Sequence, residues 1–197
     1  DSPQVKVEGV IGFGGEVRLY DRWTENREER GTTAWERLDR AGARMDQLLG
    51  GASGGGRMAG INLVMAERSP ETRVLVVEPE AYDDTARSLA AGERVGHPAG
   101  PPSICDALMA PMPGVLTWPI NRRLAGALTV SDAEVAEAVR FAFRHLKLVV
   151  EPGGAASLAA LVAGNVEGAG RTTGLILSGG NVDPALYAAI TEGRFEG

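Results

Sequence analysis

The sequence is poor in cysteine and histidine, with one cysteine, Cys105, and two histidines, His97 and His145. A single cysteine excludes an internal disulfide and fits a reducing cytosol, so we expect a cytoplasmic protein. The three side chains are also too few for the usual zinc site, which takes four cysteine or histidine ligands. We expect Cys105 to be a small buried hydrophobic residue rather than a nucleophile.

Long apolar runs, basic clusters and lysines are scarce as well. No apolar stretch approaches the roughly 20 residues that a membrane-spanning helix needs. The net charge of −6 argues against nucleic acid or an anionic membrane as a partner. Among the 20 basic residues only Lys6 and Lys147 are lysines. The 44% of hydrophobic and 23% of charged residues are typical of a globular protein that buries a core.

The hydrophobic periodicity predicts strands that alternate with helices. We expect strands at 16–20, 73–78 and 173–177, and helices at 4–13, 24–30, 32–40, 58–67, 83–91, 131–146 and 155–163. Residues 92–118 show no periodicity, and a stretch of this length is usually functional or disordered. The alternation indicates an α/β fold with a mainly parallel sheet flanked by helices.

Two local signals predict where helices begin. Ser131 and Glu134 form an S-x-x-E capping box, and Asp183 with Pro184 provides an N-cap followed by proline at the first helical position. Six apolar residues after the capping box share one helical face, which we expect to be buried: Val135, Ala138, Val139, Ala142, Phe143 and Leu146.

Two glycine loops lie far apart in the sequence, GGASGGGRMAG at 50–60 and LSGGNVD at 177–183. Each follows a short apolar run and leads into a helical pattern. A glycine-rich turn that enters a helix exposes backbone N–H groups at the positive end of the helix dipole, which suits a phosphate. The second loop adds a hydroxyl, Ser178, at the end of an apolar strand. The pair suggests a bound phosphorylated cofactor.

The residues alone leave several interpretations open. Gly54, Gly56 and Ala59 match the dinucleotide fingerprint G-x-G-x-x-G/A, with Glu78 at the spacing of a ribose-binding acid, although such glycines also simply permit a tight turn. Glu78 with the aspartates at 83 and 84 could bind Mg²⁺ or Ca²⁺, but spacing alone favours aspartates that cap a helix. Lys147 could form a Schiff base, but a basic residue in a last helical turn is the favoured interpretation.

Five segments together resemble the pyridoxal-phosphate-dependent threonine/serine dehydratase family, which includes serine racemase. They are SGGGRMAG, VEPEAYDDTARSLAAGE, SICDALMAPMPGVLTWPI, LKLVVEPGGAASLAAL and LSGGNVD, in the family's order and spacing. The resemblance covers nearly everything from residue 31 onward and displaces the dinucleotide interpretation. It implies a fold-type-II enzyme, similar to tryptophan synthase β and incomplete. Residues 1–30 would be a remnant of the small domain and 31–197 the large cofactor-binding domain.

The resemblance also implies an activity. The cofactor would be pyridoxal 5′-phosphate. The reaction would be elimination of ammonia from a β-hydroxy amino acid, L-threonine or L-serine before others, to give a 2-oxo acid. Alternatives are 3-hydroxyaspartate elimination, serine racemisation, or an inactive remnant of such an enzyme. The partners would be a small-molecule amino acid and a second copy of the chain in a homodimer.

Site residues follow from the same resemblance. The loop that holds the cofactor phosphate matches Ser53, Gly54, Gly55, Gly56 and Arg57. Ser178 matches the serine that faces the pyridine nitrogen, and Glu151 matches an acidic residue near the cofactor. Glu78, Asp84 and the backbone carbonyl of Tyr82 match a site for Mg²⁺ or Ca²⁺, which reverses the preference for helix capping.

The departures from the family concern the catalytic machinery. Neither Lys6 nor Lys147 matches the Schiff-base lysine, which the family carries further upstream, so no catalytic residue is assigned. Near residues 30–31 the chain skips a strand and a turn that the family has. Ser53 and Ala107 stand where the family has glycine, and each adds atoms where the backbone approaches the cofactor closely. We therefore expect a fragment, a degenerate relative of the enzyme, or a chain with further segments that this sequence does not include.

Overall fold

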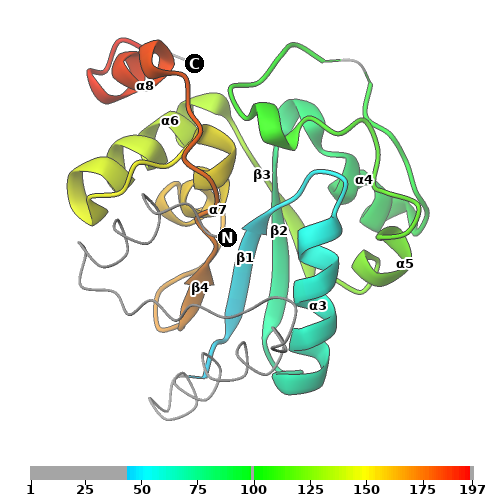
Figure 1. Ribbon diagram of the computed structural model, residues 1–197. Helices are drawn as coiled ribbons and strands as arrows, with labels where there is room; N and C mark the ends of the chain where they lie inside the picture. The colour runs from blue at the N-terminus through cyan, green and yellow to red at the C-terminus, as the bar shows by residue number, and fades with distance from the viewer. Residues whose placement is uncertain (1–43, 99, 196–197) are drawn as a thin grey trace, which may run out of the picture. The chain divides into compact units, whose positions relative to one another are not determined.

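The computed structural model describes residues 44–98 and 100–195. The chain divides into two compact units, Asp1–Arg44 and Met45–Gly197, and the description concerns the second. Its centre is a four-stranded sheet in the order β3-β2-β1-β4, shown in Figure 1. The strands are β1 (Gln47–Gly51), β2 (Arg73–Pro79), β3 (Gly126–Val130) and β4 (Thr173–Leu175). Every neighbouring pair is parallel, which confirms the predicted α/β class.

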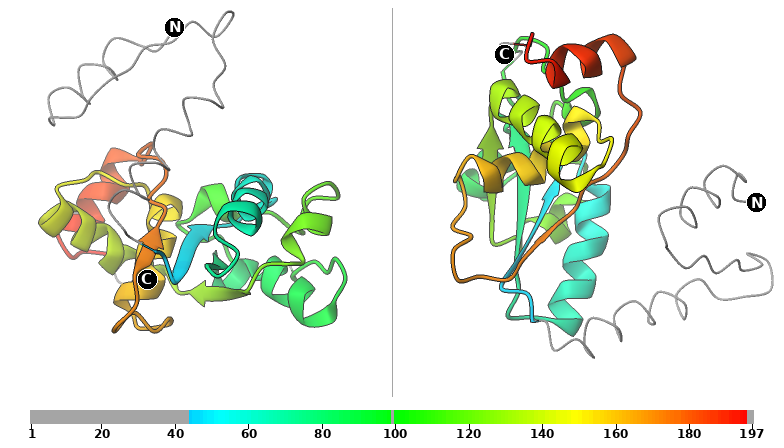
Figure 2. Two further views of the ribbon diagram at one scale, coloured as in Figure 1. Left: turned by 90° about the horizontal axis from the view of Figure 1, so that it is seen from below. Right: turned by 90° about the vertical axis from the view of Figure 1, so that its left-hand side faces the viewer.

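Helices cover both faces of the sheet, and the order of the strands explains which helix lies where. The chain moves from β1 to β2 to β3 through α3 (Gly56–Arg68) and α4 (Asp84–Ala91). It then returns past β1 to β4 through α6 (Asp132–Phe141) and α7 (Pro152–Val162). Because parallel crossovers are right-handed, opposite directions of travel place helices on opposite faces. Figures 1 and 2 show α3 on one side of the strands, and α6 and α7 on the other.

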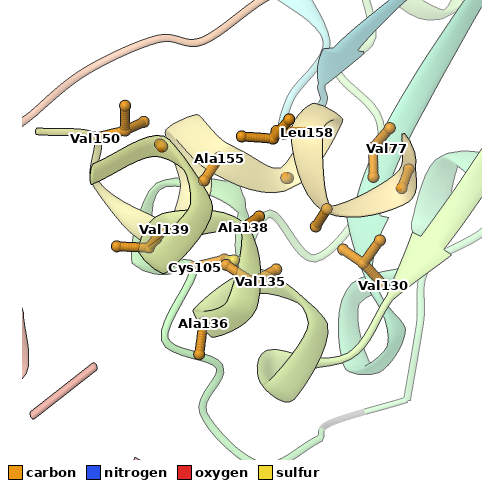
Figure 3. Packing of buried hydrophobic residues seen from close by; sticks show 14 of the residues in the cluster. Val77, Cys105, Val130, Val135, Ala136, Ala138, Val139, Val150, Ala155 and Leu158 are labelled. Atoms are coloured by element: carbon orange, nitrogen blue, oxygen red, sulfur yellow. The ribbon is translucent and has the colours of Figure 1, made fainter. Parts of the chain in front are cut away.

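The main core lies between the sheet, α7 and α6. Figure 3 shows Val135 and Ala138 of α6 near Ala155 and Leu158 of α7, with Cys105 beside them. Cys105 is fully buried, as the sequence predicted. The first nine residues of α7 are all buried and mostly alanine and glycine, so this helix can approach the sheet closely. Such packing is as dense as a crystal of small molecules, so adding or removing a single methyl group changes the stability.

Helix α6 begins as predicted but ends differently. Both hydrogen bonds of the Ser131–Glu134 capping box are present. Val135, Ala138, Val139 and Ala142 of the predicted face are completely buried, whereas Phe143 is 46% and Leu146 44% exposed. The prediction for these two residues was wrong, because Ala142–Leu146 forms a π-helix, η3. Its wider turn shifts the helical phase and carries both side chains off the buried face.

Other predicted elements also compare closely with the structure. The helices predicted at 58–67, 83–91 and 155–163 and the strand at 73–78 correspond to α3, α4, α7 and β2. α8 (Pro184–Thr191) begins after Asp183, whose carboxylate accepts the Leu186 N–H at 2.9 Å. β4 is shorter and less buried than predicted because it is an edge strand, and β3 was not predicted. The described residues of 92–118 contain only η2 (Asp106–Leu108) and the start of α5 (Trp118–Asn121). The elements predicted within 4–40 lie outside the described residues.

Candidate active site

The two glycine loops meet at one edge of the sheet. The first follows β1 and the second follows β4, and these two strands are neighbours. The chain leaves β1 in one direction and returns on its other side to β4, so their carboxyl ends form a topological switch point. In open parallel sheets the crevice at this point is where ligands bind.

A cavity of about 330 Å³ lies at this switch point. Its volume is at the lower end of the range of about 300–1,000 Å³ that is usual for small-molecule sites. It is lined by every residue that the sequence assigned to the cofactor: Ser53, Gly54, Gly55, Gly56, Arg57, Glu151 and Ser178. The other lining residues come from the same loops, from η2 and from the start of α7: Gly51, Ala52, Met58, Ala107, Leu108, Gly153 and Gly179.

The first loop presents an uncapped helix N-terminus to the cavity. Gly55 is the N-cap of α3, and no side chain caps this helix. Its φ of 83° lies in the left-handed region, where glycine is strongly favoured. A methyl group built on Gly54 or Gly56 would meet no atom within 4 Å, so this side of the loop is open. The first backbone N–H groups of a helix have no partner inside it and carry partial positive charge.

The second loop is held against the start of α7. The Glu151 N–H donates to the Gly179 carbonyl at 3.2 Å, and the Ser178 N–H donates to the Gly154 carbonyl at 3.3 Å. The Glu151 carboxylate lies over Gly179 and accepts the Asn181 N–H at 3.0 Å. A methyl group on Gly154 would overlap the Ser178 carbonyl. Glu151 and Gly154 therefore fix the position of the loop that carries Ser178.

These residues fit a phosphorylated ligand. The open loop offers N–H donors and a helix dipole to an anion, and the Arg57 side chain adds a positive charge at the cavity wall. The Arg57 guanidinium also donates to the Gly51 carbonyl at 3.1 Å, which ties it to the end of β1. Ser178 supplies a hydroxyl, and Leu108 and Met58 supply apolar surface. A phosphate with an attached ring has both polar and apolar partners here.

Comparison with known proteins agrees with this geometry. The sequence pattern described as "Pyridoxal-phosphate dependent enzyme" matches residues 17–179. The chain belongs to this family. An L-threo-3-hydroxyaspartate ammonia-lyase from Pseudomonas sp is 36% identical to it, over 98% of this chain and 68% of that protein.

Solved structures show the same relationship. The threonine deaminase of T.th. is 41% identical, with a TM-score of 0.72, over 78% of this chain and 55% of that one. Maize serine racemase is 30% identical, with a TM-score of 0.69, over 98% of this chain and 68% of that one. The chain thus spans between about half and two thirds of these relatives. Both the predicted family and the predicted fold type II are confirmed.

The residues predicted to bind a cation lie apart from the cavity. Glu78 is the last residue but one of β2 and Asp84 begins α4, and both side chains are completely buried. The Glu78 carboxylate accepts the N–H groups of Thr85 and Ala86, at 2.9 and 3.0 Å. Glu78 therefore caps α4 from outside the helix. Asp83, expected as a capping aspartate, instead pairs with Arg87 at 2.6 Å.

Burial strongly perturbs both of the buried acids. Desolvation raises the pKa of Glu78 to about 7, and the nearby Asp84 charge adds to the rise. Desolvation likewise raises the pKa of Asp84 to about 7, and neither of its carboxylate oxygens has a hydrogen-bond partner among the described residues. No group of three or more His, Cys, Asp or Glu side chains suited to a metal occurs in the part of the chain that the structure describes. The predicted set has only two carboxylates and the Tyr82 carbonyl, so clustering lends it no support.

The described lysine does not reach the cavity. Lys147 follows the π-helix with a φ of 60°, and its ammonium donates to the Arg144 carbonyl at 2.7 Å. It is exposed and does not line the cavity, whereas Lys6 lies outside the described residues. Nor does Cys105 offer a nucleophile, because burial raises the pKa of its thiol to about 12. In residues 44–98 and 100–195, no helix is both long and apolar enough to cross a membrane.

Sequence reasoning missed the residues behind the first loop. Gly114 and Thr117 bond to the carbonyl of Gly54, and Asn121 bonds to that of Gly55. Gly114 and Thr117 belong to the family-like segment at 103–120, and Asn121 follows it directly, but the resemblance assigned no role to any of the three. The available signals were this family-like segment and the length of the glycine- and proline-rich stretch without periodicity.

Proposed function

We propose that the chain carries the cofactor domain of a pyridoxal-phosphate-dependent ammonia-lyase that acts on a β-hydroxy α-amino acid. The product would be a 2-oxo acid with release of ammonia. The observation that carries the proposal is the single cavity at the switch point. It joins an open phosphate loop with the neutral hydroxyl of Ser178.

The residues of this chain would hold the cofactor at two ends. The loop at 53–57 would bind the phosphate through N–H groups at the start of α3. Ser178 would meet the pyridine nitrogen, as the resemblance implies, and a neutral hydroxyl leaves that nitrogen largely unprotonated. When bound, the cofactor supplies an electron sink for loss of the Cα proton. A weakened sink favours elimination of a β-hydroxyl over transamination.

The substrate class rests on what the relatives share. The names of three relatives at 31–36% identity refer to hydroxyaspartate, and that of the T.th. structure at 41% refers to threonine. Threonine, serine and 3-hydroxyaspartate all carry a hydroxyl on Cβ. L-threonine and L-serine are the substrates implied by resemblance, and L-threo-3-hydroxyaspartate joins them with equal standing.

The test is an assay of the full natural protein that contains this chain. It is incubated with pyridoxal phosphate and each of the three amino acids, and ammonia and the 2-oxo acid are measured. Loss of water and hydrolysis would give 2-oxobutanoate from threonine, pyruvate from serine and oxaloacetate from hydroxyaspartate. Equimolar ammonia and 2-oxo acid support the proposal, whereas binding of the cofactor without any release of ammonia contradicts it.

A second candidate function concerns the 197-residue chain by itself. Because Lys147 does not line the cavity, and neither Lys147 nor Lys6 matches the Schiff-base lysine of the family, the chain alone would bind pyridoxal phosphate reversibly and without turnover. Absorbance spectroscopy and dialysis test this: the cofactor should be removed by dialysis. A bound chromophore that survives dialysis and denaturation would contradict it.

A cation site beside α4 is proposed as well, formed by Glu78, Asp84 and the Tyr82 carbonyl. What supports it is the pair of buried carboxylates, one of them without any hydrogen-bond partner in the described structure. Buried charges are normally paired or bound to metals, and oxygen ligands suit Mg²⁺ or Ca²⁺. The 1–30 and 31–197 division, a homodimer and a cytoplasmic location also remain proposals, the dimer being testable by light scattering.

A further inference from the structure

The back of the first glycine loop is held by the segment that leads into α5. The Gly114 N–H donates to the Gly54 carbonyl at 3.1 Å, and the Thr117 hydroxyl donates to the same carbonyl at 2.6 Å. The Asn121 side-chain amide donates to the Gly55 carbonyl at 3.0 Å, and the same carbonyl accepts the Ala59 N–H of α3 at 2.9 Å. Thr117 and Asn121 do not line the cavity, so they contact the loop from the side away from the ligand.

These bonds fix the direction of two peptide groups. In a planar trans peptide the carbonyl of one residue and the N–H of the next point in opposite directions. None of the peptide bonds in the described structure is cis. Because the carbonyls of Gly54 and Gly55 are bonded toward Thr117 and Asn121, the N–H groups of Gly55 and Gly56 are aimed the other way. That direction is the open side of the loop.

The packing around the loop shows the same two sides. A methyl group on Gly55 would overlap the Asn121 amide and approach the Thr117 hydroxyl to 3.1 Å. On Gly54 and Gly56 it would meet nothing within 4 Å. The loop therefore has a closed back, formed by Thr117 and Asn121, and an open front.

The burial of Asn121 points to orientation rather than stability as its main effect. Its side chain is only 2% exposed, and its carbonyl oxygen is buried with no partner among the described residues. One hydrogen bond is made while another acceptor is left unpaired, and such a balance contributes little net stability. The amide nevertheless has one fixed partner, the Gly55 carbonyl.

We infer that Thr117 and Asn121 are positioning residues for phosphate binding. Together with the Gly114 N–H at Gly54 and the Ala59 N–H at Gly55, they hold these two carbonyls away from the cavity, so that N–H groups rather than carbonyl oxygens face the anion. The inference rests on the proposed function, because it takes the phosphate of the cofactor as the ligand of this loop. It adds two residues that touch neither the cofactor nor the substrate but help to fix which backbone atoms do.

The test compares pyridoxal phosphate with pyridoxal, which lacks the phosphate. Binding to the 197-residue chain is measured by titration calorimetry for Thr117→Val and Asn121→Ala. Each variant should weaken pyridoxal phosphate about tenfold, the effect of one lost hydrogen bond to an anion-binding group. Pyridoxal affinity should stay unchanged, and Thr117→Ser should restore the affinity for pyridoxal phosphate.

The matched control is Thr72→Val, because the Thr72 hydroxyl also donates to a backbone carbonyl, that of Met45 at 2.7 Å, outside the cavity. Equal losses for both ligands, or an equal loss in Thr72→Val, overturn the inference. So do variants that bind pyridoxal phosphate as tightly as the unmodified chain. If the unmodified chain binds pyridoxal phosphate no better than pyridoxal, the proposed function fails and the inference fails with it. Should Asn121→Ala not fold, as judged by circular dichroism, the comparison of Thr117→Val with Thr117→Ser decides.

Discussion

The contact between α7 and the Ser178 loop predicts opposite effects for one substitution at two helical glycines. Gly154 lies in the first turn of α7, where a methyl group would overlap the Ser178 carbonyl. Gly60 lies within α3, and a methyl group there would meet no atom within 4 Å. We expect Gly154→Ala to destabilise the chain and Gly60→Ala to stabilise it.

The expected magnitudes follow from the surroundings. At Gly60 only helix propensity changes, and alanine is favoured over glycine by about 1 kcal/mol. At Gly154 the overlap is with a backbone carbonyl, and the Ser178 N–H is bonded to the Gly154 carbonyl itself. Neither partner can turn aside as a flexible side chain would. Overpacking of this kind destabilises by about 1–3 kcal/mol, and little helix propensity is gained in a first turn.

Urea unfolding followed by circular dichroism measures both effects at one fixed protein concentration. In thermal unfolding of a unit of this size, a change of about 1 kcal/mol in the free energy of unfolding corresponds to a shift of about 2–4 °C in the melting temperature. Gly154→Ala should also weaken pyridoxal and pyridoxal phosphate alike, because it displaces Ser178 rather than the phosphate loop. Stabilisation by Gly154→Ala similar to that by Gly60→Ala would refute the close contact between α7 and the Ser178 loop.

Three further predictions concern other groups. In the presence of a chelator, the free energy of unfolding should fall as the pH rises from about 4 through about 7, because burial raises the pKa of Asp84 to about 7. Its stabilisation is complete only below the unfolded value near 4. Mg²⁺ or Ca²⁺ at pH 8 should restore the melting temperature, and a cation response that persists in Asp84→Asn would point back to helix capping. Cys105, buried and with its pKa raised to about 12, should react with Ellman's reagent only after unfolding, so rapid reaction of the native chain would contradict the packing. After incubation with pyridoxal phosphate and reduction with borohydride, Lys147 should carry no stoichiometric adduct, which peptide mapping by mass spectrometry checks. Such an adduct together with lyase activity would reverse the prediction.

Local signals in the sequence predicted local structure well. The capping box at Ser131 and the N-cap at Asp183 use atoms within three residues of each other, so their geometry is encoded where it occurs. The position of the glycine loops at strand ends was likewise readable. Their meeting in one cavity followed from the resemblance to a family, and the strand order supplies the physical reason.

Features that depend on distant partners were missed. β3 lies at the sheet edge with only Val130 fully buried, so GALTV lacks the alternating pattern that would have marked a strand. The π-helix after α6 depends on how the chain packs there and not on a recognisable motif. Asn121 contacts Gly55 across 66 positions of sequence, and no short pattern reports such a pair.

The neighbouring positions of β1 and β4 have a consequence for the synthesis of the protein. Gln47 pairs with Thr173, 126 positions later, and the cavity needs the loops that follow both strands. At translation rates of about 5–20 residues per second, β1 waits roughly 6–25 s for its second neighbour. Pairing of such distant segments is also intrinsically slow. In the folded unit the Leu49 carbonyl of β1 accepts the Ile176 N–H, and during this interval it has no such partner. The unpaired edge of β1 is then open to chaperones or to other strands. The cofactor can therefore engage both of its loops only after nearly the whole described unit has left the ribosome.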